Sequence, residues 1–171
     1  RGKERSIFKD SRIGLDLWKK KIVTLGFDRA LDIGLPGVNK GQVPGPDYYD
    51  RLYGKHRWAF STIYSLGIGQ GELLISPLQM AHFCAIIANR GFYYNPHLLK
   101  KVGGEDISGE NTQKVFTPFD KKYFEVIVEG MDNVVNDEYG TGFYARMPDI
   151  RVCGKTGTAQ NSGKDHSVFI A

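Results

Sequence analysis

Apolar residues recur at helical spacing near the start of the chain, which indicates a helix with one buried face. Gly26 follows them and is a typical helix stop. Glycine and proline are then frequent between Gly34 and Pro46, so residues 27–50 are expected to form a long surface loop. The pattern predicts an amphipathic helix over residues 10–26, with an inward face made of Ile13, Leu17, Ile22 and Leu25.

Aromatic residues and then glycines follow this loop. We expect the aromatic side chains to fill buried space beneath the loop, and a platform that stacks on a ligand is the less favoured alternative. The glycine-rich stretch Ser65–Glu72 lacks the Lys-Ser/Thr of a phosphate-binding loop and the spacing of a dinucleotide-binding loop, so nucleotide binding is not expected. The aromatic residues are Tyr48, Tyr49, Tyr53, Trp58, Phe60 and Tyr64.

Two further helices are predicted by their start signals. Ser76 as a cap, Pro77 in the first turn and Gln79 as the partner of a capping box predict a helix over residues 77–89, which Gly91 ends. Its residues are apolar on nearly all faces, so we expect it to be central and buried, with His82 as a core histidine. Thr117-Pro118 predicts the start of another helix that runs to about residue 136.

The end of the chain has the features of a β-hairpin. The run 150–154 alternates in polarity and predicts a strand that leads into Lys155-Thr156-Gly157-Thr158. Residues 161–164 predict a turn, and residues 166–171 predict a second strand that the chain does not complete. The expected fold class is α/β (α+β), an antiparallel sheet flanked by helices.

Composition limits the possible functions. The 171 residues are 41% hydrophobic and 25% charged, as in ordinary soluble domains. The net charge of +4 is spread along the chain, and without a basic stripe with exposed aromatic residues, no nucleic-acid binding is expected. Cys84 and Cys153 are too few for a disulfide framework or a metal site, and we expect both to be unpaired and buried. The sequence has no apolar run long enough to cross a membrane and no signal peptide.

The tetrad Lys155–Thr158 suits a ligand that ends in a carboxylate. Lys155 supplies a positive charge, and the hydroxyls of Thr156 and Thr158 can donate hydrogen bonds to carboxylate oxygens. Gly157 has no side chain, so the ligand backbone can approach the strand closely. Lys-Thr-Gly is also the third signature of β-lactamases and penicillin-binding proteins.

Further segments in a fixed order make this signature specific. With them, the sequence resembles the transpeptidase domain of class B penicillin-binding proteins, especially the elongation type, penicillin-binding protein 2. The segments are Asp32-Ile33-Gly34-Leu35-Pro36-Gly37, Gly41-Gln42-Val43-Pro44, Ser65-Leu66-Gly67-Ile68-Gly69-Gln70-Gly71, Ser76-Pro77-Leu78-Gln79-Met80-Ala81, Ala88-Asn89-Arg90-Gly91, Pro96-His97-Leu98 and Lys155-Thr156-Gly157-Thr158-Ala159-Gln160.

The resemblance implies an acyl transfer. A serine attacks the D-Ala-D-Ala end of a peptidoglycan stem peptide, and the acyl group then passes to an amine of a neighbouring strand. It implies that Lys155 holds positive potential over the site, that Thr156 and Thr158 bind the terminal carboxylate, and that the Thr158 backbone N–H forms half of the oxyanion hole. It implies β-lactams as inhibitors and a polytopic glycosyltransferase of the elongation machinery as partner. It also implies a single membrane anchor, an extracytoplasmic location and no metal or organic cofactor.

The sequence departs from the family pattern in the other two motifs. Its one Ser-x-x-Lys, Ser6-Ile7-Phe8-Lys9, follows a polar stretch and leads into an amphipathic helix, whereas the family nucleophile opens a buried apolar helix. Ser6 is therefore not expected to be the nucleophile. No Ser-x-Asn or Ser-x-Asp occurs, and Tyr93-Tyr94-Asn95 imitates this motif in the wrong order.

These departures predict that residues 1–171 are part of a transpeptidase domain, from after the second motif through the Lys-Thr-Gly strand. Alone, this stretch is expected to be inactive, poorly soluble and unreactive to penicillin. The alternatives are a sensor-type or other non-catalytic penicillin-binding domain, a β-lactamase, a D,D-carboxypeptidase, or an unrelated α/β domain with a chance Lys-Thr-Gly.

Overall fold

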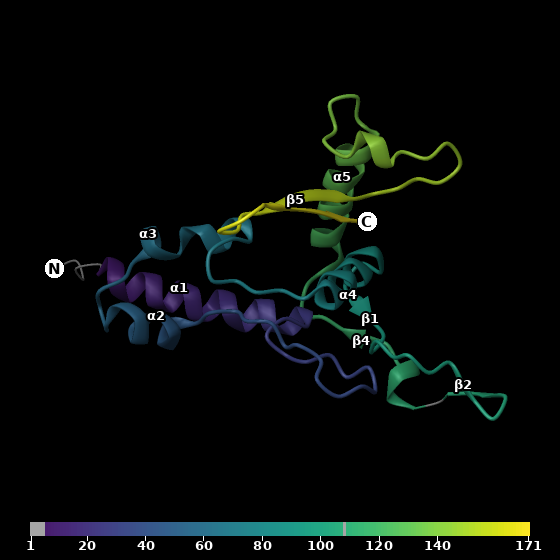
Figure 1. The fold of residues 1–171 in the computed structure, drawn as a ribbon, viewed down its shortest axis with the longest axis horizontal. Helices are drawn as coiled ribbons and strands as arrows, with labels where there is room; N and C mark the ends of the chain where they lie inside the picture. Colours follow the sequence, from purple (N-terminus) through teal and green to yellow (C-terminus); the bar gives the residue numbers. More distant parts are fainter. Residues whose placement is uncertain (1–5, 108) are drawn as a thin grey trace. The chain divides into compact units, whose positions relative to one another are not determined.

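The computed structural model describes residues 6–107 and 109–171, and Figure 1 shows their helices and strands. The chain divides into two compact units. The first unit contains residues up to Ala30 together with Val38–Ser76, and the second contains Leu31–Gly37 with Pro77–Ala171. The helical elements of the first unit are α1 (Ile7–Ile22), η1 (Val23–Leu25), α2 (Pro46–Tyr53), α3 (Phe60–Ile63) and η2 (Tyr64–Ile68).

The first helix exists, but it begins earlier than expected and buries a different face. Ser6 caps α1, and Gly26 ends the helical stretch in the left-handed conformation with φ of 93°, as predicted. Ile13 and Leu17 are 49% and 56% exposed, so their assignment to the inward face was wrong. Leu15 is buried instead, in a cluster with Tyr49, Trp58, Ile63 and Leu66. The spacing of apolar residues in this helix is compatible with more than one buried face. The face that contains Leu15 is the one that packs against this cluster.

The expected loop over residues 27–50 is shorter than predicted. Gly45 and Pro46 begin α2, because proline is compatible with the first turn of a helix. An isolated antiparallel bridge joins Gln42 to Leu74 and fixes the end of the loop. Among the aromatic residues, Tyr49 and Trp58 are buried as expected, whereas Tyr53, Phe60 and Tyr64 are exposed.

The second unit contains the two longer predicted helices, α4 (Pro77–Ala88) and α5 (Lys121–Asn136). Pro77 begins α4 as predicted, and Gly91 follows it with φ of 103°. Only one face of α4 is buried, with Gln79, His82, Ile86 and Ile87 inside, while Ala81, Ala85 and Ala88 are exposed. The expectation of burial on nearly all faces was therefore wrong in this structure, whereas His82 is a core residue whose ring meets Tyr93 edge-on at 4.5 Å.

The start of α5 was predicted at the wrong residue. Asp120, not Thr117, caps the helix, with its carboxylate accepting from the Lys122 N–H at 3.0 Å. The Thr117 hydroxyl and backbone N–H both donate to the Gly91 carbonyl, at 2.9 and 2.8 Å. Thr117 therefore closes the turn after α4 and is not available as a cap.

The described part of the second unit also contains three antiparallel pairs of strands: β1 (Phe92–Tyr93) with β4 (Val115–Phe116), β2 (Lys101–Val102) with β3 (Glu105–Asp106), and β5 (Lys155–Ala159) with β6 (His166–Ile170). Short 3-10 turns lie at Glu110–Thr112 (η3) and Phe143–Ala145 (η4). The α+β class with helices around antiparallel strands is thus confirmed. The strand expected over residues 150–154 is absent from the described chain, and the strand begins at Lys155.

Candidate functional site

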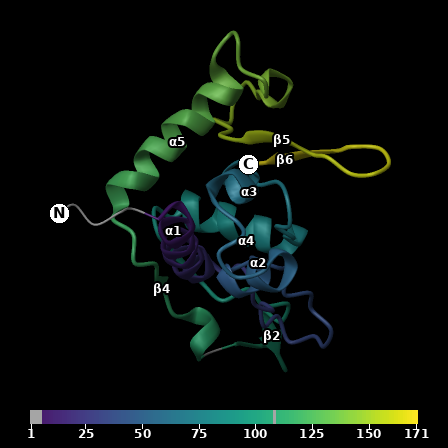
Figure 2. The same ribbon diagram turned by 90° about the vertical axis from the view of Figure 1, so that its left-hand side faces the viewer.

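The β5–β6 hairpin carries the whole Lys-Thr-Gly-Thr tetrad (Figure 2). Five consecutive cross-strand pairs, from Lys155 with Ile170 to Ala159 with His166, fix its register. Successive side chains of a strand point to opposite faces, so Lys155 and Gly157 share one face, and Thr156 and Thr158 share the other. Among the described residues, β5 has a strand partner on the β6 side alone.

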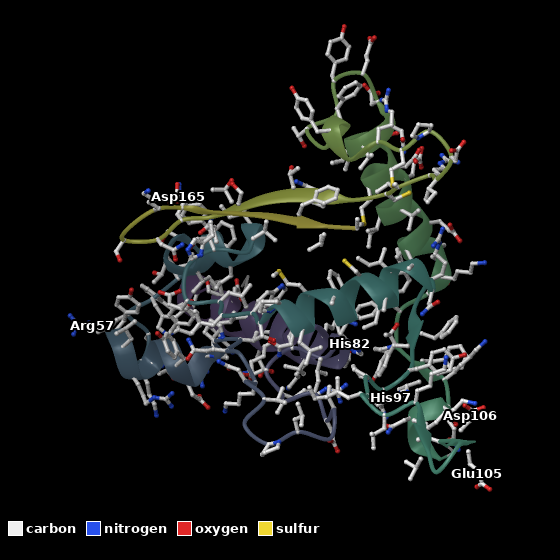
Figure 3. The ribbon with its side chains drawn as sticks, turned by 45° about the vertical axis from the view of Figure 1, so that its right-hand side comes forward. Arg57, His82, His97, Glu105, Asp106 and Asp165 are labelled. Atoms are coloured by element: carbon white, nitrogen blue, oxygen red, sulfur yellow. The ribbon has the colours of Figure 1, made fainter. Side chains whose placement is uncertain are left out.

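The hairpin turn lies where the sequence predicts it. Residues 160–165 join the two strands, and the Asp165 carboxylate accepts from the Asn161 N–H at 3.3 Å. Figure 3 shows Asp165 at this end of the hairpin. The Asn161 side-chain amide also donates to the Ala159 carbonyl at 3.1 Å. These bonds hold the far end of β5 against its partner strand.

Lys155 and Thr156 of the tetrad form hydrogen bonds with neighbouring groups. The Lys155 ammonium lies at an exposed position and donates to the Thr156 carbonyl at 2.6 Å. The Thr156 hydroxyl lies 2.9 Å from the hydroxyl of Thr141, which belongs to the turn after α5. A hydroxyl has one proton and two lone pairs, so when Thr141 donates, Thr156 keeps its own proton for another acceptor.

The segment that enters β5 is bonded to α5. Gly154 N–H donates to the Met131 carbonyl at 3.0 Å, and the Asn136 amide donates to the Val152 carbonyl at 2.9 Å. These bonds explain why residues 150–154 are not a strand, since the backbone groups of Val152 and Gly154 are used by a helix. The alternation of polarity along residues 150–154 did not reveal these hydrogen bonds to α5.

Asp132 is the charged centre of this contact. Its carboxylate accepts from Arg151 Nε at 2.8 Å and Nη2 at 2.6 Å, from the Asn136 amide at 2.8 Å, and from the Cys153 thiol at 3.6 Å. The hydrogen bond from Arg151 is the main reason why the pKa of Asp132 lies far below its usual range. Burial, and secondarily Asp132, raise the pKa of Cys153. Sequence reasoning missed Asp132, because no motif or spacing links it to Arg151.

Helix α4 lies on the other side of the hairpin's second strand. An open, largely apolar hollow of about 500 Å³ separates them. It is lined by one face of α4, including Ala81, Cys84 and Ala85, and by the end of β6, including Val168 and Ile170. Cys84 and Cys153 are both free thiols, as predicted, but both are half-buried and not buried as expected.

Other sequence features show no sign of a second site. Ser6 is an exposed helix cap whose hydroxyl accepts from the Lys9 backbone N–H at 3.5 Å, and residues 1–5 before it lie outside the described part of the chain. Throughout the described ranges, histidine, cysteine and carboxylate side chains form no cluster of three or more that could hold a metal ion. None of the helices described here has the length and apolar character needed to span a bilayer.

Comparison with known proteins identifies the family. The model of the penicillin-binding protein transpeptidase domain matches residues 7–169. The chain belongs to the penicillin-binding protein transpeptidase family. The peptidoglycan D,D-transpeptidase MrdA of Acinetobacter baumannii is 32% identical over 154 residues, which are 88% of this chain and 22% of that protein. This chain therefore spans about a quarter or less of the length of such curated relatives.

Solved structures agree with this assignment. The crystal structure of Pseudomonas aeruginosa PBP2 in complex with WCK 5153 has a TM-score of 0.76 and 26% identity, and the match covers 95% of this chain and 37% of that one. A chain from a peptidoglycan synthase complex that coordinates polymerization and crosslinking has a TM-score of 0.72 and 26% identity, with coverages of 91% and 25%. The resemblance to class B penicillin-binding proteins, and among them to penicillin-binding protein 2, is confirmed.

Proposed function

We propose that this chain supplies the Lys-Thr-Gly side of a peptidoglycan D,D-transpeptidase site in the whole protein. The observation that carries the proposal is the tetrad Lys155–Thr158 on β5, which pairs with β6 along one edge and, in the described residues, meets no further strand along the other. A stem peptide ending in D-Ala-D-Ala would pair with that edge as an added strand. A β-lactam would occupy the same place, in keeping with the penicillin-binding family to which the chain belongs.

Each residue of the tetrad has a role in this proposal. Lys155 attracts the terminal carboxylate of the substrate, and the hydroxyls of Thr156 and Thr158 donate to it. Gly157 leaves room for the substrate backbone. The Thr158 N–H stabilises the oxyanion that forms when a serine attacks the penultimate D-Ala carbonyl; loss of such a donor costs about 2.7–4 kcal/mol in other enzymes.

The serine nucleophile and the second motif lie outside residues 1–171 in this proposal. Ser6 caps an exposed helix, and the hydrogen bond that its hydroxyl forms within the described residues comes from the Lys9 backbone N–H, not from a side-chain base. Residues 1–171 alone are therefore expected not to crosslink peptidoglycan or to react with penicillin. In the whole protein, the acyl-enzyme forms by release of the last D-Ala and is resolved by the amine of a neighbouring stem peptide.

The location and partners of the whole protein are proposed by analogy with its family. We infer a membrane-anchored protein whose transpeptidase domain acts on the outer face of the cytoplasmic membrane. We also infer a complex with a polytopic glycosyltransferase of the elongation machinery. A similar chain belongs to a synthase complex that coordinates polymerization and crosslinking, which supports this partner.

The test is penicillin labelling of the full-length protein that carries this segment. Brief exposure to benzylpenicillin, followed by intact-mass and peptide mapping, should give a stable adduct on a serine outside residues 1–171. Lys155→Met should slow labelling about a hundredfold or more, because the carboxylate loses its counter-charge. Lys164→Met, in the turn of the same hairpin, removes the same charge and should label at the wild-type rate.

Each other result has a defined meaning. An adduct on Ser6 would refute the placement of the nucleophile while keeping the family chemistry. Rapid hydrolysis of the drug with regeneration of the enzyme would indicate a β-lactamase. No adduct and no hydrolysis would indicate a non-catalytic penicillin-binding domain. Equal loss of labelling in both lysine variants would show a general charge effect and would remove the specific role of Lys155.

A further inference from the structure

The last six residues of α5 include three that are bonded to the segment that leads into β5. We call the contact the α5 clamp: Met131, Asp132 and Asn136 of α5 with residues 151–154. It comprises the two backbone-directed bonds, Gly154 N–H to the Met131 carbonyl and the Asn136 amide to the Val152 carbonyl. It also comprises the paired bonds from Arg151 to the Asp132 carboxylate.

Resting on the proposed transpeptidase function, we propose that Asp132 and Arg151 are positioning residues for Lys155 and the oxyanion-hole strand. The α5 clamp ends one residue before Lys155. Residues 151–154 have no strand partner among the described residues, so the bonds to α5 determine where β5 begins. Catalytic groups must be held within about 0.5 Å of their working positions, which requires such a support.

The geometry of the α5 clamp favours positioning over a simple surface ion pair. Arginine meets the carboxylate with two parallel N–H bonds, and this fork restricts both the direction and the distance of the pair. The Asp132 side chain is only 16% exposed, whereas that of Arg151 is 78% exposed. The Asp132 carboxylate is therefore largely enclosed by the protein, and the exposed Arg151 extends to it from the segment 151–154.

Asn136 couples the ion pair to the backbone. Its amide nitrogen donates both to Asp132 Oδ1 at 2.8 Å and to the Val152 carbonyl at 2.9 Å. The orientation of the Asp132 carboxylate thus determines the orientation of an amide that holds the backbone three residues before Lys155. Loss of the carboxylate should release both the Arg151 side chain and the Val152 carbonyl.

The helix offers a matched control. Glu125 also belongs to α5 and also accepts from an arginine, Arg90 Nε, at 3.0 Å. Its side chain is 50% exposed and its partner lies in the turn after α4, away from the segment 151–154. Glu125→Gln therefore removes a carboxylate–arginine pair from the same helix without touching the α5 clamp.

Two readouts in the full-length protein test the proposal. The first is hydrogen exchange of a peptide that covers Lys155–Ala159, and the second is the second-order rate constant of acylation by benzylpenicillin. Asp132→Asn should raise exchange about tenfold, equivalent to about 1.4 kcal/mol of local opening free energy, and slow acylation about ten- to a hundredfold. Arg151→Gln, at an exposed position, should act in the same direction, and Arg151→Lys should restore part of both.

The outcomes separate this proposal from the transpeptidase function. Faster exchange with slower acylation in the Asp132 and Arg151 variants, and neither in Glu125→Gln, supports positioning. Unchanged exchange in folded Arg151→Gln overturns the proposal, even where the wild type is acylated normally. Faster exchange with unchanged acylation also overturns it, because the α5 clamp would then be structural only. A wild type that is never acylated refutes the function, and in that case exchange alone shows whether the α5 clamp holds β5.

Discussion

Gly154 and Gly157 lie three residues apart around the start of β5, and the space around their Cα atoms differs sharply. A Cβ added at Gly157 would meet nothing within 4 Å. A Cβ added at Gly154 would lie 2.4 Å from Phe169 Cζ and 2.8 Å from the Ile170 carbonyl oxygen. Packing therefore requires glycine at position 154 but does not require it at position 157. The proposed function supplies the missing reason, since the substrate backbone would lie against Gly157.

The magnitudes follow from these surroundings. Alanine in a strand is about 0.5–1 kcal/mol more favourable than glycine, so Gly157→Ala should leave the thermal midpoint unchanged or raise it slightly. At Gly154 the neighbours are a ring and a backbone carbonyl, and overpacking of this kind costs about 1–3 kcal/mol. Gly154→Ala should therefore lower the thermal midpoint. For Gly157→Ala, a ligand displaced by about 1 Å should react about a hundredfold more slowly.

The assay compares both variants in the full-length protein. Thermal unfolding gives the midpoint, and labelling by benzylpenicillin gives the acylation rate constant. We expect Gly157→Ala to keep the thermal midpoint of the wild type, or exceed it slightly, and to be acylated more slowly. A Gly157→Ala enzyme that is acylated at the wild-type rate would refute the placement of the ligand along β5. A Gly157→Ala enzyme with a much lower midpoint would instead show that the strand itself requires glycine there.

Three further predictions concern other parts of the chain. The α5-clamp hydrogen bond from Arg151 lowers the pKa of Asp132. The ionised Asp132 carboxylate therefore stabilises the fold fully above its unfolded-state pKa of about 4, and this stabilisation is lost as pH falls through the lowered pKa. The difference in thermal midpoint between wild type and Asp132→Asn should be constant from pH 8 to pH 5 and narrow below about pH 4. Asp132 contributes to the raised pKa of Cys153, so in Asp132→Asn Cys153 should be alkylated faster at pH 8, while Cys84, whose pKa is raised by burial alone, should react at its original rate. Tyr49→Phe removes the 2.6 Å hydrogen bond to the Glu72 carboxylate and should lower stability by about 1.5–3 kcal/mol, measured by denaturant unfolding; no loss would show that water replaces the bond.

Local signals in the sequence were sufficient to find the main elements of the second unit. Pro77 and Gly91 bracket α4, and the polar residues 160–165 separate two β-forming runs, because start, stop and turn chemistry depends on residues close in the chain. The face of α1 was assigned wrongly for the opposite reason. Leu15 is buried by residues such as Trp58 and Ile63, which are far away in sequence and leave no mark on the spacing within the helix.

The candidate site also has one part that the sequence predicts and one part that it does not. The tetrad could be found because its residues are consecutive and carry a recognisable signature. The support beneath it could not be found, because Asp132 and Arg151 come from a helix and an irregular segment with no shared period. The alternation of residues 150–154 even predicted a strand, since pattern alone cannot show that the Val152 carbonyl and the Gly154 N–H are bonded to a helix.

The two faces of β5 limit where a carboxylate could bind. Lys155 and Gly157 lie on one face of β5, with Ile170 and Val168 as their cross-strand partners, while Thr158 projects to the opposite face. A carboxylate that lay over either face would meet the ammonium or the hydroxyl, but not both. The edge of β5 away from β6 is the place from which groups on both faces can be reached, together with the backbone. The proposed roles of Lys155 and Thr158 are therefore compatible only if the ligand lies along this edge, as an added strand would.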